Sequence, residues 1–135
     1  MIVADTNLVS YLLIEGEHTE TARAVRAREP FWLVPPLWRS EFLNVLAVAV
    51  RHKILDEAQA FHAWRAAVLL LGGSEREPGG EAVLSIAIRN GISAYDAHFV
   101  ALAQASSCVL VTGDRKLQRT CRDVAIAPEE FVNSP

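Results

Sequence analysis

Four short apolar segments, each stopped by polar or turn-forming residues, alternate along this chain with longer segments of helical periodicity. The apolar segments cover residues 1–4, 31–35, 108–112 and 124–127, and the last is expected to be an edge strand. Short apolar runs of this kind are typical of buried strands. Strands that alternate with helices form a parallel sheet covered by helices on both faces, with right-handed connections. The sequence therefore predicts the α/β class.

The helices are predicted from apolar spacing and from residues that begin or end a helix. Asp5, Thr6 and Asn7 are all able to cap a helix that starts at residue 8. Further helices are expected over residues 18–28, 37–51, 56–71, 81–90, 94–105 and 115–122. The helix over 37–51 is apolar on nearly all sides, so we expect it to be buried. Glycine and proline gather in residues 72–80, which predicts a loop with room for a short strand.

Length and composition indicate one globular domain over residues 1–135, with 51% hydrophobic residues. No apolar run reaches the roughly 18 residues that a membrane span needs. The opening MIVADTN has neither the basic lead nor the cleavage site of a signal peptide, so we expect a cytoplasmic location. The two cysteines, Cys108 and Cys121, lack metal-ligand spacing, and Cys108 is expected to be a buried, reduced thiol.

The formal net charge of −3 argues against a general basic surface for nucleic acid. Four of the 16 acidic residues, however, are candidates for a single site. Without those four, 12 acidic residues remain against 13 basic ones. The acidity of the whole chain is therefore a weak objection to a nucleic-acid substrate.

The four candidate carboxylates are placed by the strands and helices around them. Functional groups in a parallel sheet collect beyond the carboxyl ends of the strands. Asp5 follows the strand over 1–4, and Asp114 lies two residues beyond the strand over 108–112, so both share an edge if these strands are neighbours. Glu41 lies about one turn into the helix after residues 31–35. Asp96 lies in the first turn of its helix, and the sequence alone does not fix where that helix returns.

Each carboxylate also has an ordinary structural interpretation. An aspartate at a strand-to-helix turn is usually a cap or a turn residue, and Asp96 is a first-turn acid that the helix dipole favours. Glu41 is harder to explain, because it lies among Trp38, Phe42 and Leu43, where an unpaired carboxylate is costly. A Mg²⁺ or Mn²⁺ ion would be a suitable partner, since both prefer oxygen ligands. Such ions promote phosphodiester cleavage, whereas without metal the four groups would raise one another's pKa and titrate together.

Other polar residues near these carboxylates are candidates for supporting roles: Asn7, Asn44, Thr112 and, with less support, Ser10. Asn44 shares a helix face with Glu41 and is able either to orient that carboxylate or to bond to nearby backbone. Three basic residues lie near the same edge and could either bind phosphate groups or simply be solvated at the surface: Arg39, Arg115 and Lys116. The four histidines show no ligand spacing and are left out of the site. His98, two residues past Asp96, lies on a different helix face.

The carboxylates lie in four sequence blocks that resemble those of PIN-domain ribonucleases. The blocks are DTN at 5–7, SEFLNVL at 40–46, SAYDA at 93–97 followed by VALA at 100–103, and LVTGDRKL at 110–117. Their order and the chain length resemble VapC-type toxins of bacterial and archaeal toxin–antitoxin modules. The resemblance covers essentially the whole chain, and its specificity comes from four blocks in order rather than from any one of them.

The resemblance implies a three-layer α/β/α sandwich around a central, mainly parallel sheet. It implies an endoribonuclease that depends on Mg²⁺ or Mn²⁺, with catalytic and metal-binding carboxylates at four positions: Asp5, Glu41, Asp96 and Asp114. It also implies a homodimer and a cognate antitoxin that places a basic side chain in the acidic pocket. The chain departs from the family at His98, where an aromatic residue is more usual.

Two other functions stay open at this point. A phosphatase or phosphotransfer domain could use Asp5, since an aspartate after the first strand is shared with those folds. Haloacid-dehalogenase phosphatases, however, have a second aspartate where this chain has Asn7, and neither the acidic pair of receiver domains nor a glycine-rich phosphate loop is present. A non-catalytic binding module is the other alternative. Trp32, Trp38 and Trp64 could line its interface, although core packing or dimerisation explains them as well. The RNA target and the number of metal ions are left open.

Overall fold

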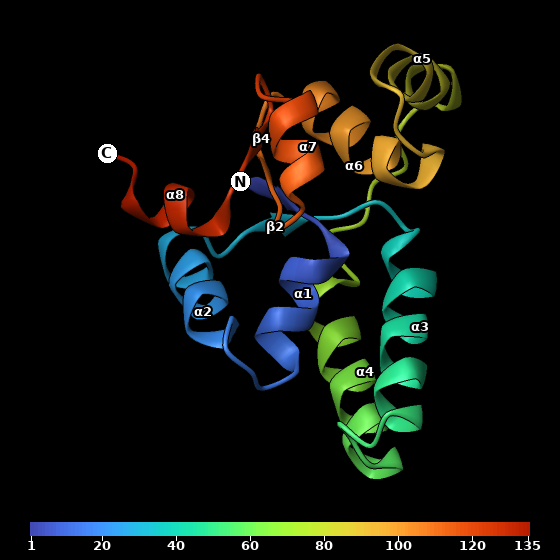
Figure 1. Cartoon of the computed structure of the whole chain (residues 1–135), viewed down its shortest axis with the longest axis vertical. Coiled ribbons are helices and arrows are strands. Elements are labelled where there is room, and N and C mark those ends of the chain that lie inside the picture. The colour runs from blue at the N-terminus through green and yellow to red at the C-terminus, as the bar shows by residue number, and fades with distance from the viewer.

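The computed structural model describes all residues from 1 to 135. Four short strands and eight helices follow one another along the chain (Figure 1). In order, the elements are β1 (Ile2–Ala4), α1 (Thr6–Leu13), α2 (Thr19–Arg28), β2 (Trp32–Leu33), α3 (Trp38–Arg51), α4 (Glu57–Leu71), α5 (Gly80–Asn90), α6 (Ala94–Ala105), β3 (Leu110–Val111), α7 (Arg115–Thr120), β4 (Ala125–Ile126) and α8 (Pro128–Asn133).

The strands form one sheet in the order β2-β1-β3-β4, and every neighbouring pair is parallel. Val3 in β1 pairs with Leu33 on one side and with Leu110 on the other, and Leu110 pairs in turn with Ala125. The carboxyl ends of β1 and β3 therefore lie beside each other. The predicted α/β class is confirmed, and β4 is an edge strand as expected.

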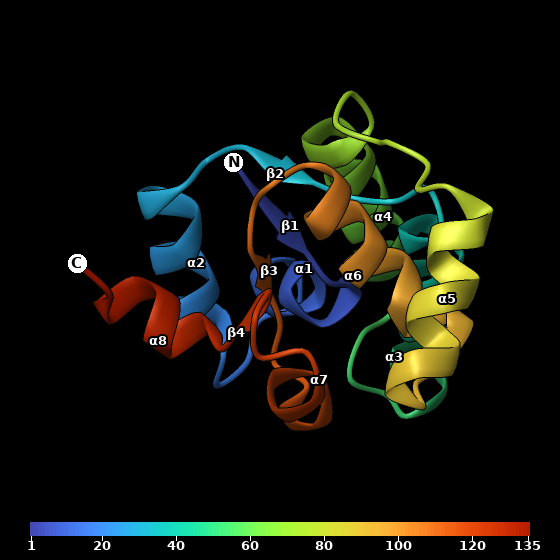
Figure 2. The same ribbon diagram turned by 90° about the horizontal axis from the view of Figure 1, so that it is seen from above.

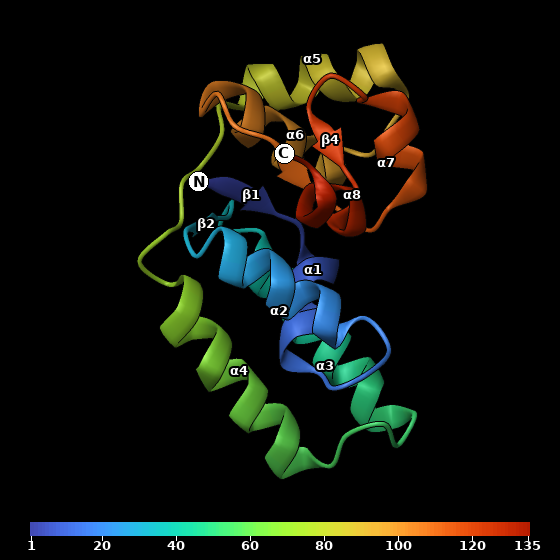
Figure 3. The ribbon, with the colours of Figure 1, turned by 90° about the vertical axis from the view of Figure 1, so that its left-hand side faces the viewer.

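Side chains alternate across the sheet and divide the interior into two cores. In β1, Ile2 and Ala4 belong to one core and Val3 to the other, as the two-residue period of a strand requires. Helices α1 to α4 cover the first core, and α5, α6 and α7 cover the second. The views in Figures 1 and 3 show the sheet between these two groups of helices. The result is the three-layer α/β/α sandwich implied by the resemblance.

The observed elements agree closely with the predicted ones, although the strands are shorter. The segment 31–35 pairs as a strand only at Trp32 and Leu33, because Pro35 and Pro36 beyond it have no N–H to donate to a neighbouring strand. Val34 makes an isolated bridge with Glu75, which lies in the glycine- and proline-rich loop. That loop therefore does approach the sheet, as the sequence allowed.

Two predictions about helices were wrong. Helix α8 was not expected, although Pro128 at its start is a common first residue of helices. It packs beside α2 at the end of the sheet near β4 (Figure 2). Helix α3 is not buried all round: Phe42 and Leu46 face the core, whereas Leu43 is 47% exposed. Because α3 and α4 form a hairpin that extends away from the sheet, nothing covers the outer side of α3.

The structure decides between the two interpretations open for the tryptophans and corrects one cysteine. Trp32 and Trp38 pack in the core, and only Trp64 is partly exposed. Cys108 is half-buried rather than buried, while Cys121 is buried, and both are free thiols. None of the helices combines the length and the apolar character that crossing a membrane requires.

Candidate active site

Four carboxylates from four separate elements line one cavity of about 270 Å³: Asp5, Glu41, Asp96 and Asp114. Asp5 follows β1 and caps α1, and Asp114 follows β3 and caps α7. Because β1 and β3 are parallel neighbours, both caps lie at the same edge of the sheet. Glu41 and Asp96 reach this edge from the first turns of α3 and α6. The structure thus brings together all four carboxylates that the sequence singled out.

Asp5 is held by hydrogen bonds to both of its carboxylate oxygens. Its Oδ1 accepts from the backbone N–H of Leu8 at 2.8 Å, and its Oδ2 accepts from the Thr112 hydroxyl. The Thr112 Oγ1 in turn accepts from the backbone N–H of Asp114 at 3.0 Å. Thr112 is fully buried and Asp5 nearly so. The end of β3 therefore fixes the positions of two carboxylates through one hydroxyl group.

Asp114 and Glu41 each keep one oxygen free. Asp114 Oδ1 accepts from the backbone N–H groups of Lys116 and Leu117, at 2.8 and 3.2 Å, and Oδ2 has no hydrogen-bond partner. Glu41 Oε1 accepts from the Thr6 hydroxyl at 2.6 Å, and Oε2 likewise has none. Sequence reasoning treated Thr6 only as a helix cap. Its contact with Glu41 depends on how α1 packs against α3, which no sequence pattern reports.

Burial and mutual repulsion both change the acidity of these groups. Burial raises the pKa of Asp5 from 3.8 to about 6, and the negative charges of Asp114 and Glu41 add to the rise. The hydrogen bonds from Thr112 and from the Leu8 backbone lower this pKa, but by less. Burial also raises the pKa of Glu41, where Asp96 adds repulsion, and the pKa of Asp96, where Asp114 does so. The carboxylates therefore interact with one another and resist full ionisation.

The donor set suits a hard divalent cation that shares its coordination with water. All the donors are carboxylate oxygens, and the free oxygens of Glu41 and Asp114 are available to an ion. No group of three or more acidic, histidine or cysteine side chains is gathered tightly enough to hold an ion unaided. Mg²⁺, however, commonly takes only one or two carboxylates and completes its shell with water and substrate phosphates. The residues present fit such an ion, which would also relieve their repulsion.

The remaining predicted residues divide into those that line the cavity and those that do not. Asn7 and Asn44 line it. Ser10 does not, and its hydroxyl donates to the Thr6 carbonyl within α1 at 2.9 Å. Arg39 also lies outside the lining, because Glu75 holds its guanidinium in two hydrogen bonds of 2.6 and 3.0 Å. Arg39 is thus committed to a contact within the chain.

Two basic side chains and one histidine lie around the carboxylates. Arg115 lines a second, larger cavity of about 420 Å³. Lys116 does not line the carboxylate cavity, but its positive charge contributes to lowering the pKa of Asp96. His98, which the sequence left out of the site, does not line the cavity, although its charge contributes to lowering the pKa of Glu41. The i, i+2 spacing from Asp96 gave no indication of this effect on Glu41.

The chain is similar in sequence and in fold to known proteins. The family model of the PIN domain matches residues 2–123. The chain is 34% identical over 128 residues to VapC ribonuclease Mb0985 of Mycobacterium bovis and to ribonuclease VapC9 of Mycobacterium tuberculosis, covering 89% of this chain and 91% of each relative. The crystal structure of PAE2754 from Pyrobaculum aerophilum aligns with a TM-score of 0.76 and 25% identity, over 97% of this chain and 92% of that one. FitAcB from Neisseria gonorrhoeae shares the fold at a TM-score of 0.72 and 20% identity, over 96% and 99% of the two chains.

Proposed function

The chain belongs to the PIN-domain family, and we propose that it is an endoribonuclease that hydrolyses RNA phosphodiester bonds with Mg²⁺ or Mn²⁺. The observation that carries this proposal is that four carboxylates from four separate segments line one cavity, at the edge of the sheet where the strands end. The ribonuclease names of the 34% identical relatives support the choice of RNA as substrate. The proposal takes residues 1–135 as one nuclease domain.

The polar residues of the cavity and the buried Thr112 divide this activity between them. Asp5, Glu41, Asp96 and Asp114 would hold the cation. When bound there, a divalent cation supplies an activated water and stabilises the oxygen that leaves. Thr112 and Thr6 keep Asp5 and Glu41 in position through their hydroxyl groups, as described above. The amides of Asn7 and Asn44 face the same space and are able to orient water or a phosphate oxygen.

The charge of the cavity explains why this chain would need a cation to act on RNA. Carboxylates at the centre repel the phosphate groups of the substrate. Arg39 does not offset this repulsion, because its positive charge is already paired with Glu75. Lys116 and Arg115, both exposed on α7, are the basic side chains left to meet RNA near the cavity.

The resemblance to VapC ribonucleases also supports a biological role. We propose that the chain is the toxin of a toxin–antitoxin module in the cytoplasm and that it acts as a homodimer. A cognate antitoxin would inhibit it by placing a basic side chain among the four carboxylates. Such a side chain would take the place of the cation and satisfy the same negative charge.

No specific observation favours the alternatives that the sequence left open. For phosphoryl transfer, Asp5 would have to act as a nucleophile, but it is only 7% exposed, and Asn7 stands where haloacid-dehalogenase phosphatases have a second aspartate. For a binding module, two of the three tryptophans would have to lie at the surface, and both are buried.

The proposal is tested by incubating the purified chain, free of partners, with total RNA and Mg²⁺ or Mn²⁺. Discrete products are expected from the wild type and none from Asp5→Asn or in the presence of EDTA. Asp123→Asn is the matched control, because Asp123 is exposed and does not line the cavity. RNA left intact by folded, metal-supplied wild type would overturn the nuclease. Cleavage that survives Asp5→Asn would overturn the assignment of the site.

A further inference from the structure

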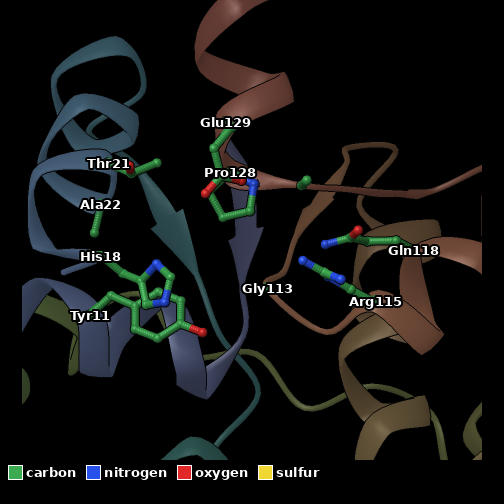
Figure 4. Close-up of a pocket in the computed structure, with 10 residues that line it drawn as sticks. Tyr11, His18, Thr21, Ala22, Gly113, Arg115, Gln118, Pro128 and Glu129 are labelled. Carbon is green, nitrogen blue, oxygen red and sulfur yellow. The ribbon is translucent and has the colours of Figure 1, made fainter.

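A second cavity lies on the other side of the turn that carries Asp114. Its volume is about 420 Å³, and it is enclosed by α1 and α2 on one side and by α7 and α8 on the other. In Figure 4 the rings of Tyr11 and His18 lie together at one wall, and Arg115 and Gln118 extend from the opposite wall. This volume is within the range of sites that bind small molecules. Of the residues that line it, only Arg115 has a role in the proposed activity, as a basic side chain near the RNA.

The aromatic wall is a ready surface for stacking. The ring centroids of Tyr11 and His18 are 4.5 Å apart, with 37° between the ring planes. Tyr11 is half-buried, and the His18 side chain is 48% exposed, so a flat ligand is able to reach the pair from solvent. Unpaired bases of single-stranded RNA are commonly bound by stacking on such side chains.

The cavity is joined to the carboxylate site by a close contact at Gly113. A Cβ atom at position 113 would lie 2.9 Å from the Tyr11 hydroxyl, so the Tyr11 ring packs directly against this turn. The neighbours of Gly113 in the chain are Thr112 and Asp114, which both belong to the carboxylate site. A nucleotide bound against Tyr11 would therefore be adjacent to a phosphodiester bond held at the carboxylates.

The opposite wall offers an unpaired positive charge. Arg115 makes no ion pair and no side-chain hydrogen bond within the chain, in contrast to Arg39, and its guanidinium extends into the cavity (Figure 4). Gln118 is fixed next to it, because its Nε2 donates to the Thr112 carbonyl at 2.7 Å. A free guanidinium facing a cavity is suited to a phosphate group.

We propose that this cavity is a nucleotide subsite, in which the exposed His18 ring, backed by the Tyr11 ring, stacks on one base of the RNA substrate and Arg115 binds the phosphate beside that base. The inference rests on the proposed ribonuclease function, since it assigns the cavity to a substrate nucleotide next to the bond that is cut. It names two residues, Tyr11 and His18, that the carboxylate site does not include. Gln118 and Glu129 line the remaining space and present oxygen acceptors to the base.

Binding of adenosine 5′-monophosphate (AMP) is measured by NMR titration. EDTA is present to remove divalent cations, so that the carboxylate cavity repels the phosphate group of the probe. The nucleotide is expected to shift the signals of His18 and Arg115. His18→Ala is expected to weaken binding about tenfold, the size of one lost stacking contact, and Arg115→Gln about tenfold as well, through the loss of a charged contact to the phosphate. His18→Phe keeps a stacking ring and should bind within about twofold of wild type. Arg119→Gln, an exposed position on the same helix outside both cavities, is the matched control.

Two results would overturn the subsite. One is the absence of AMP-dependent shifts at His18 and Arg115. The other is ribose 5-phosphate binding as tightly as AMP, because a site for phosphate alone does not need the aromatic wall.

A second assay separates this inference from the nuclease proposal. With an RNA substrate and Mn²⁺, His18→Ala and Arg115→Gln are expected to raise KM about tenfold and to leave kcat nearly unchanged. Wild type that cleaves RNA but binds no AMP in this cavity would overturn the subsite alone. Wild type that binds AMP here but cleaves no RNA would overturn the nuclease and support a nucleotide site of another purpose.

Discussion

Replacing Asp5 by asparagine is expected to stabilise the metal-free protein at neutral pH. Burial raises the pKa of Asp5 from 3.8 to about 6 in the folded state. Between these two pH values the folded protein holds a proton that the unfolded chain has lost. The free energy of unfolding therefore falls as pH rises through this window. One pH unit corresponds to about 1.36 kcal/mol, so a shift of about two units costs about 3 kcal/mol above pH 6.

The asparagine variant is free of this cost because its side chain stays neutral. Its amide oxygen is still able to accept from the Leu8 N–H, and the Thr112 hydroxyl is able to rotate and accept from the amide nitrogen. We expect the two proteins to be about equally stable near pH 4. Near pH 7 the variant is expected to be more stable by up to about 3 kcal/mol.

The assay is urea unfolding of both proteins in chelated buffers from pH 4 to pH 8, followed by the fluorescence of the buried Trp32 and Trp38. Asp123→Asn, at an exposed position, should show no pH-dependent difference from wild type. A stability difference that is the same at all pH values, or a wild type that is the more stable protein at pH 7, would refute the reasoning. Added Mg²⁺ should narrow the difference, because it binds only the wild-type site well.

The metal-dependent cleavage rate is expected to fall below about pH 6, because protonated Asp5 does not bind a cation, and a pH–rate profile that stays flat to pH 5 would contradict this. Thr112→Val removes the hydroxyl that donates to Asp5 and accepts from the Asp114 N–H, so the pKa of Asp5 should rise and the free energy of unfolding should fall by about 1–3 kcal/mol. Thr112→Ser, which keeps the hydroxyl, is the control. A urea midpoint of Thr112→Val equal to that of wild type would contradict this prediction. Gly113→Ala places a methyl group 2.9 Å from the Tyr11 hydroxyl and should destabilise the fold by about 1–3 kcal/mol. Combining it with Tyr11→Leu should restore part of that loss in the same unfolding assay, and a loss that stays complete would argue against the clash.

The positions of Asp5 and Asp114 could be predicted because each directly follows an apolar strand. Parallel neighbours end at the same edge, and β1 and β3 are such neighbours. Asp96 could not be placed in this way, because it follows a helical hairpin, and its position depends on how α5 and α6 pack together. Its membership of the site came from the resemblance to PIN-domain ribonucleases alone.

Contacts between helices were the part that the sequence did not predict. The hydrogen bond from Thr6 to Glu41 depends on the angle at which α1 and α3 pack. The exposure of Leu43 has the same origin, since its apolar character does not tell whether another element covers it. Helix α8 has only six residues, too few for a periodic pattern, so only Pro128 could have indicated its start.

The central claim is that the four carboxylates together hold the divalent cation that the protein needs to cleave RNA. It is tested most directly by measuring Mn²⁺ binding and RNA cleavage on the same samples of wild type and of four variants: Asp5→Asn, Glu41→Gln, Asp96→Asn and Asp114→Asn. We predict that Mn²⁺ affinity and cleavage rate fall together in the variants while the proteins stay folded. Cleavage at the wild-type rate in any variant that no longer binds Mn²⁺, or in EDTA, would contradict the claim.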